Sequence, residues 1–183
     1  MKILRALINK ISNGNNIKEN QKGYSSIVAQ NFRKIEFIHY SNGEYLIKNV
    51  IGKPDSFEVD KMVPRNIIEF KIQNVVIQQL FKSYGLKPLK QFYMEGYDII
   101  HCDEDVFAFG DDDIAIVCET KGEIISSMWL NRRVKKNNMK SVLETVFLKL
   151  GNQFELLAIN WVSKRYYFLF GPDDAKDFIR QCM

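Results

Sequence analysis

The sequence contains few of the residues that carry metal and redox chemistry. Three cysteines and two histidines occur among 183 residues. Cys102, Cys118 and Cys182 are far apart, so no pair has the spacing of a zinc site or a redox motif. The glycine-rich signatures of phosphate-binding loops, GxxxxGK(S/T) and GxGxxG, are absent as well. These absences argue against a disulfide framework, a zinc domain and a nucleotide-binding loop, and we expect neither a metal nor a cofactor.

Long apolar runs are also missing. No stretch approaches the roughly 20 apolar residues that a membrane-spanning helix needs. The N-terminal segment resembles a secretory signal, but Arg5 and Lys10 interrupt its apolar stretch and no small-residue cleavage site follows. We therefore expect a short amphipathic helix over 1–11 and a polar, mobile linker over 12–23. Reduced cysteines and the lack of a secretory signal predict a cytoplasmic protein without a membrane partner.

The overall composition is that of an ordinary folded protein. Hydrophobic residues make up 46% of the chain and charged residues 26%, which is typical of a globular domain rather than a disordered or fibrous one. The length fits one domain of normal size. We expect a single domain over 1–183, whose α+β body begins at residue 24.

Two patterns stand out in the first half of the chain. Apolar runs within 35–51 flank Ser41-Asn42-Gly43, and Asn-Gly is a strong turn signal, so this segment is predicted to be a β-hairpin. A helix is predicted from Pro64, which suits the first helical position, to a stop at Gly85. Its expected buried stripe consists of Ile68, Ile72, Val75, Val76 and Leu80.

The pattern of residues in the second half of the chain predicts a sheet packed with helices. Four short β-rich runs within 97–130 are separated by tight turns, which favours an antiparallel meander because parallel strands need long crossovers. A helix is predicted over 137–151 with its end at Gly151, then a hairpin within 155–170 and a last short helix capped by Asp173. The apolar side of the first of these helices consists of Val142, Val146, Phe147 and Leu150. The fold class is therefore α+β, an antiparallel β-meander packed with helices.

Charge is distributed unevenly along the chain. The net charge of +4 divides into +8 over 1–90, −8 over 91–122 and +4 over 123–183. Such asymmetry bears on partners and association rates rather than on fold. Much of the acidic charge falls in two predicted turns, which lie at opposite ends of the sheet if the meander is regular. Aspartate favours turns for structural reasons alone. We take the six residues of these turns as candidate partner-binding residues: Asp111, Asp112 and Asp113 first, then Asp103, Glu104 and Asp105.

One interpretation of the acidic residues is that they belong to an enzyme active site. The order helix, strands, helix, strand, together with Asp105 and Glu119-Thr120-Lys121, resembles the PD-(D/E)xK nuclease family. That resemblance implies two carboxylates that hold Mg²⁺ and a lysine near the attacked phosphate. The chain departs from the family because Lys121 precedes Gly122 in a predicted turn, whereas the family lysine lies within a strand. A metal-dependent nuclease is an alternative function.

Acid–base and nucleophilic chemistry have weaker signals. His39 and His101 both lie in β-rich runs, where histidine is usually structural. No flanking motif supports a Cys118–His101 pair as a nucleophile and its base. The sequence therefore favours a non-enzymatic protein.

The segment 161–170 raises a third possibility. It interleaves aromatic residues with Lys164 and Arg165, and aromatic platforms beside positive charge suit single-stranded nucleic acid. Strand alternation instead places Trp161, Tyr166, Phe168 and Phe170 on one core-facing side, and we favour that interpretation. A single-stranded nucleic-acid-binding module is a second alternative.

The two acidic loops and the lack of a catalytic constellation make the chain similar in type to bacterial immunity proteins of contact-dependent and other polymorphic toxin systems. That resemblance implies a small cytoplasmic α+β protein that neutralises a cognate toxin by covering its active site. The implied partner is a basic toxin domain, steered by the acidic turns and held by buried anchors. The overall basic charge departs from the acidic character of many nuclease inhibitors. A toxin-neutralising binding protein is the leading functional hypothesis.

Overall fold

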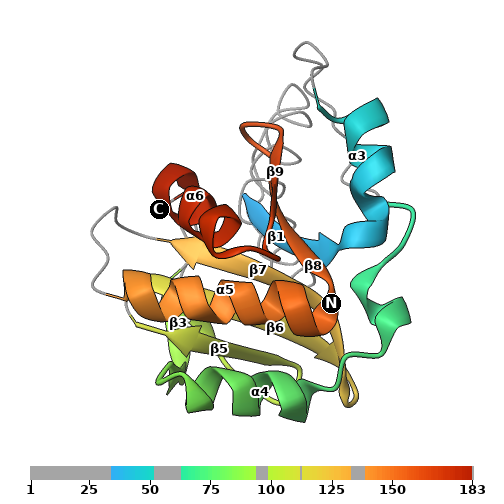
Figure 1. The fold of residues 1–183 in the computed structure, drawn as a ribbon. Helices are drawn as coiled ribbons and strands as arrows, with labels where there is room; N and C mark the ends of the chain where they lie inside the picture. Colours follow the sequence, from blue (N-terminus) through green and yellow to red (C-terminus); the bar gives the residue numbers. More distant parts are fainter. Residues whose placement is uncertain (1–33, 52–62, 94–98, 112, 133–138, 183) are drawn as a thin grey trace, which may run out of the picture.

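The computed structural model describes residues 34–51, 63–93, 99–111, 113–132 and 139–182 (Figure 1). The predicted N-terminal helix and linker, over 1–23, lie outside these residues. Within them the chain forms four α-helices, a seven-stranded antiparallel sheet and a separate two-stranded sheet. The α+β fold class is confirmed.

The large sheet has the strand order β2-β5-β6-β7-β1-β8-β9. Its strands are β2 (Lys87–Leu89), β5 (Val106–Gly110), β6 (Ile114–Lys121), β7 (Ile124–Arg132), β1 (Ile35–His39), β8 (Leu156–Asn160) and β9 (Arg165–Phe168). Strand β1, the first in the chain, pairs on one side with β7 and on the other with β8. The sheet is therefore completed by contacts between residues more than 90 positions apart.

The two faces of the sheet are covered differently. Helices α4 (Asn74–Ser83), α5 (Lys140–Phe154) and α6 (Pro172–Cys182) lie on one face (Figure 1). The main core between them and the sheet includes Phe37, Phe109, Phe147 and Phe178. On the other face, strands β3 (Gln91–Tyr93) and β4 (Ile99–His101) pack over β5 to β7, while α3 (Gly43–Asn49) packs over β1 and β8. No helix among the described residues is long and apolar enough to cross a membrane.

The predicted hairpin over 35–51 is wrong in its second arm. Strand β1 ends at His39, a 3₁₀-helix η2 (Tyr40–Asn42) follows, and α3 begins at Gly43. Asn42 does not form an exposed turn, because its buried amide bonds the carbonyl of His39 and both backbone groups of Arg65. Strand β1 thus pairs with β7 and β8 rather than with the segment that follows it, and that segment forms helix α3.

The helix predicted from Pro64 to Gly85 is two elements. A 3₁₀-helix η3 (Ile67–Phe70) ends at Lys71, whose left-handed backbone (φ 51°) breaks the run before α4. The break rotates the buried side: Ile72 and Leu80 are buried as expected, whereas Val75 and Val76 are exposed. Gly85 does end α4, since at φ 81° it lets the next amide bond back to Phe81.

The meander is confirmed for three of its four runs. Strands β5, β6 and β7 are consecutive antiparallel neighbours, and the two-residue turn between β6 and β7 includes Gly122 at φ 63°. The fourth run, β4, pairs instead with β3 in the small sheet. Phe92 from that sheet is buried against Trp129 of the large one, so the two sheets share an apolar core.

The predicted end of the helix at Gly151 is also wrong. Helix α5 continues to Phe154, and Gly151 lies within it. The glycine is needed for space, because a Cβ atom there would overlap the backbone carbonyl of Leu169. The hairpin of β8 and β9 is present as expected, while α6 begins at Pro172 and the carboxylate of Asp174, not Asp173, accepts the amide of Gly171.

Replacement of Gly151 by alanine tests this close approach. G151A forces the helix and the Leu169 backbone apart, and we expect a loss of about 1–3 kcal/mol in the free energy of unfolding, measured by urea denaturation. Gly43→Ala is the matched control, since it lies in a helical conformation with open space around it. That variant should be neutral or more stable by up to about 1 kcal/mol. Equal stability of G151A and the wild type would contradict this account of the packing.

Candidate functional site

The two acidic turns are built in the same way. The Oδ1 atom of Asp103 accepts the amides of Asp105 and Val106, and that of Asp111 accepts the amides of Asp113 and Ile114, all at 2.9–3.0 Å. These are Asx turns, in which the first aspartate shapes the backbone. Part of the acidic pattern therefore has a structural cause. Asp112 lies outside the described residues.

The strand register places the two turns at opposite ends of β5, as expected from the meander. The turn at 103–105 precedes β5 and the turn at 111–113 follows it. Following the antiparallel pairings from β5 to β9 brings the 103–105 turn to the same end of the sheet as Tyr40 and Phe168. We call this the Tyr40 end of the sheet.

The surroundings of the two turns differ in charge. Next to the 111–113 turn, the pairings place Lys87 opposite Gly110 and Arg132 opposite Ile114. The 103–105 turn is held by Thr120, whose amide and hydroxyl bond the carbonyls of Asp105 and Glu104 at 2.8 and 3.2 Å. One turn therefore has basic residues at neighbouring register positions. The other turn is firmly held.

The structure brings together two residues of the nuclease hypothesis. Asp105 lies beside Glu119, since Val106 pairs with Glu119 and the Asp105 carbonyl accepts the next amide. The Glu119 side chain is buried and accepts a 2.8 Å hydrogen bond from Ser127, while Lys121 is exposed where β6 ends. In the part of the chain that the structure describes, no group of three or more His, Cys, Asp or Glu side chains could hold a metal ion.

The aromatic segment at the chain's C-terminal hairpin is more exposed than the sequence predicts. Trp161 is buried as expected, and its indole donates a 2.6 Å hydrogen bond to Glu36. Phe168 and Phe170 are 41% and 37% exposed, so the prediction that they face the core is wrong. The reason is topological: β9 is the last strand of the large sheet, and α3 covers β1 and β8 rather than β9.

These rings form a continuous row with Tyr40, which is 44% exposed. The ring centroids are 5.2 Å apart between Tyr166 and Phe168, 5.9 Å between Phe168 and Phe170, and 6.1 Å between Phe170 and Tyr40. We call these four residues the aromatic row. Contiguous exposed apolar surface of this kind marks interaction sites more often than scattered exposed residues do.

The cations predicted to accompany these rings do not all lie with them. Side chains alternate along β9, so Arg165 and Tyr167 project to the opposite face, where both bond the amide oxygen of Gln181 on α6. Burial, together with a hydrogen bond from the phenol to Cys182, raises the pKa of Tyr167 to about 12. The aromatic row is therefore apolar, without the guanidinium of Arg165 beside it.

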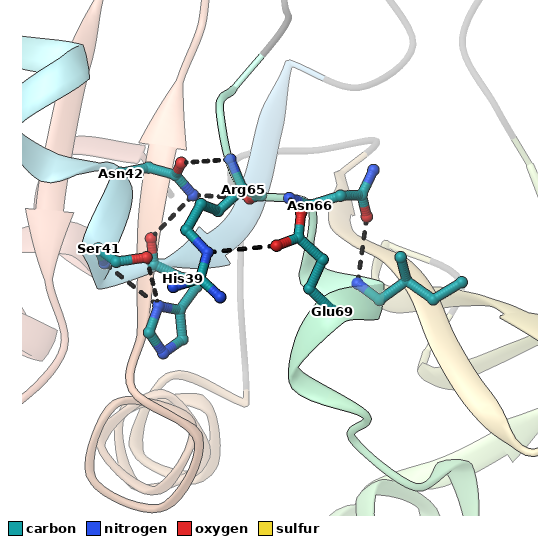
Figure 2. Close-up of polar contacts among 7 residues, drawn as sticks. His39, Ser41, Asn42, Arg65, Asn66 and Glu69 are labelled. Carbon is teal, nitrogen blue, oxygen red and sulfur yellow. Dashed lines mark hydrogen bonds and ion pairs between the residues drawn. The ribbon is translucent and has the colours of Figure 1, made fainter.

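A polar cluster surrounds His39 at the end of β1 (Figure 2). It lies next to the aromatic row, since the ring centroids of His39 and Tyr40 are 4.9 Å apart. His39 is 5% exposed, and its imidazole stacks on Phe70 with centroids 3.4 Å apart. Its Nδ1 atom lies 2.8 Å from the hydroxyl of Ser41, and its Nε2 atom 3.2 Å from the carboxylate of Glu155. Arg65 lies over the other partner of the stack, with its guanidinium carbon 4.7 Å from the Phe70 centroid.

The protonation state of this histidine follows from its contacts. The backbone amide of Ser41 also donates to Nδ1, at 3.2 Å, so Nδ1 carries no proton and Nε2–H donates to Glu155. Burial lowers the pKa of His39 below its usual 6.5, against the opposite effect of the Glu155 contact, and Arg65 lowers it further. His39 is thus a neutral imidazole near pH 7.

The sequence correctly predicted that His39 lies in a strand, but it did not predict the contacts of His39 with Ser41 and Glu155. Glu155 follows α5 in a left-handed conformation (φ 53°), where glycine is the usual residue. Its backbone carbonyl accepts the Tyr40 amide at 2.8 Å and so fixes the two segments together. No local pattern indicates a contact between residues 116 positions apart.

Comparisons of this chain with protein-family models, with curated proteins and with solved structures found no match.

The lowered pKa of His39 predicts a pH-dependent stability. Because the unfolded chain binds the proton more tightly than the folded one, the free energy of unfolding should fall as the pH drops below about 6.5 and through the folded-state pKa. Urea midpoints at about pH 7.5 and 5.5 measure the fall. We expect a smaller fall for His39→Gln than for the wild type. His101→Gln, at an exposed position, is the control and should keep the wild-type fall; identical falls in all three proteins would contradict the prediction.

Proposed function

We propose that this protein acts by binding another protein, and that the partner is a basic toxin domain which it neutralises. The observation that carries the proposal is the aromatic row, which runs from the outer strand β9 to Tyr40 of η2 at the end of the sheet where one acidic turn is firmly held. Aromatic residues supply much of the affinity at protein interfaces, because they bury large area at low conformational cost.

The aromatic row suits an anchoring role. Three of its rings are more than a third exposed, yet they pack on one another, so their positions are defined before a partner arrives. Preorganised rings lose little entropy on binding. An apolar pocket on the partner would remove Phe168 and Phe170 from water.

The acidic turn at 103–105 suits a steering role. Strands β6, β7, β1 and β8 separate β5 from β9, so the turn and the aromatic row are roughly 24 Å apart at about 4.8 Å per strand. A standard interface of about 800 Å² per partner is of similar width. A basic partner can therefore contact the rings and approach Glu104 together. Charges at the rim of an interface change the association rate and its salt dependence.

A protein partner explains the row better than single-stranded nucleic acid does. Two of the three ring contacts are edge-to-face, at 84° and 82°, so the rings cover one another rather than presenting successive open faces to bases. Arg165, which would contact phosphates, projects to the other face. Single-stranded nucleic acid remains the second candidate partner, because exposed aromatic rings can still stack on bases.

Truncation of one ring tests the anchoring role. In the toxin systems that the chain resembles, the immunity gene lies beside the toxin gene, so the product of the adjoining gene is the partner to test. Phe168→Ala should weaken binding to that purified product by at least about tenfold in Kd, measured by calorimetry. Ile99→Ala, an exposed apolar residue on the small sheet, should leave Kd unchanged. Undiminished affinity of F168A would contradict the role of the aromatic row. Binding of a fluorescent oligothymidylate that F168A abolishes would favour the nucleic-acid alternative instead.

Charge reversal distinguishes the two acidic turns. Glu104→Lys lies at the Tyr40 end and Asp113→Lys at the opposite end, and neither carboxylate shapes an Asx turn. We expect E104K to slow association with the same toxin several-fold, with a larger effect at low ionic strength, and D113K to have the smaller effect. The measurement is the association rate constant at low and high salt. An effect that does not vary with salt would exclude electrostatic steering.

A further inference from the structure

We propose that Ser41, His39 and Glu155 form a nucleophilic site, in which Ser41 attacks the carbonyl carbon of a carboxylic ester with an apolar acyl group. This goes beyond the proposed binding function and does not depend on it. Such constellations recur on unrelated folds and are recognised by geometry and roles rather than by sequence order.

The hydrogen bonds run in the direction that the chemistry requires. The unprotonated Nδ1 of His39 accepts the Ser41 hydroxyl at 2.8 Å, and Nε2–H donates to Glu155 at 3.2 Å. A nucleophile, a base and a carboxylate that orients the base are therefore connected in one chain. The two ring nitrogens have exchanged the positions that they occupy in the serine protease triad, while the roles are the same.

The base is buried and the nucleophile is exposed, an arrangement that suits a reaction at the surface. The imidazole is held by the Phe70 stack and by burial, whereas Ser41 is exposed and accessible to a substrate. Burial keeps the base neutral near pH 7, the form that can accept a proton. The Glu155 carboxylate lies on Nε2 of His39 although the residue has a left-handed backbone (φ 53°), a conformation that favours glycine.

The neighbours of Ser41 indicate the class of substrate. Tyr40 precedes it and contacts Phe170, so an exposed aromatic surface lies beside the hydroxyl and can hold an apolar acyl group. Arg65 supplies positive charge close to His39, and its Nε atom is held by Glu69 at 3.2 Å (Figure 2). Its terminal amino groups can stabilise the negative oxygen that develops on the attacked carbonyl.

The reaction balances without a co-reactant other than water. The Ser41 oxygen forms a bond to the carbonyl carbon as its proton passes to Nδ1 of His39. That proton is delivered to the departing alkoxide when the ester C–O bond breaks, which leaves an acyl-serine. Water then attacks the acyl-serine, its proton passes to Nδ1, and the same proton returns to the Ser41 oxygen as the free acid leaves. Ser41 and His39 are the catalytic residues, and Glu155 is a positioning residue.

A fluorophosphonate probe tests the site on the full chain, with peptide mass spectrometry to locate the label and p-nitrophenyl butyrate to follow turnover. We expect labelling at Ser41, complete loss in Ser41→Ala, and labelling at least about tenfold slower in Glu155→Gln. Ser163→Ala, at an exposed serine in the turn between β8 and β9, is the control and should label as the wild type does. Urea midpoints check that the variants are folded.

The pH dependence of the labelling rate distinguishes a catalytic role of His39 from a purely structural role as the cap of η2. If His39 is the base, the labelling rate rises with a single pKa below 6.5 and is level by pH 7, because the neutral imidazole is then fully formed. No labelling, labelling that persists in S41A, or a rate that increases with hydroxide throughout and is unchanged in E155Q would each overturn the proposal. The hydrogen bonds would in that case only cap η2.

Discussion

The structure depends above all on the position of β1 between β7 and β8. This strand joins the antiparallel meander of β5 to β7 to the hairpin of β8 and β9, and without it the large sheet would be two separate pieces. Phe37 on β1 packs against rings from α5 and α6, so the same strand organises the main core. Its ladder with β8 also sets the end of the sheet, where the Tyr40 amide bonds Glu155.

The features on which the two proposals rest lie at that end. Because β1 ends beside the start of β8 and the end of β9, Tyr40 meets Phe170, and His39 meets Glu155. The same register brings the acidic turn at 103–105 to this end and leaves the turn at 111–113 at the other. The aromatic row, an acidic turn and a hydrogen-bonded serine therefore occupy one end of the sheet, and both proposals place their interactions at this end.

Local patterns predicted what depends on neighbouring residues. Tight turns and alternating apolar residues identified the meander, and Gly85 ended its helix, because turn geometry and strand period act over a few residues. The errors arose where a distant contact prevailed over a local signal. Asn42 is a strong turn residue, yet its amide bonds the backbone of Arg65. Gly151 is a typical helix stop, yet it provides space for Leu169 inside α5.

The sequence by itself determined the α+β class, the three consecutive strands β5 to β7 and the two acidic turns, because each follows from local spacing and composition. The tertiary structure alone decided which turn shares an end with exposed aromatic rings, that Phe168 and Phe170 face solvent, and that Ser41, His39 and Glu155 meet. These outcomes require strand order and register across the sheet. Strand order and register are set by the packing of the whole core, which local periodicity does not encode.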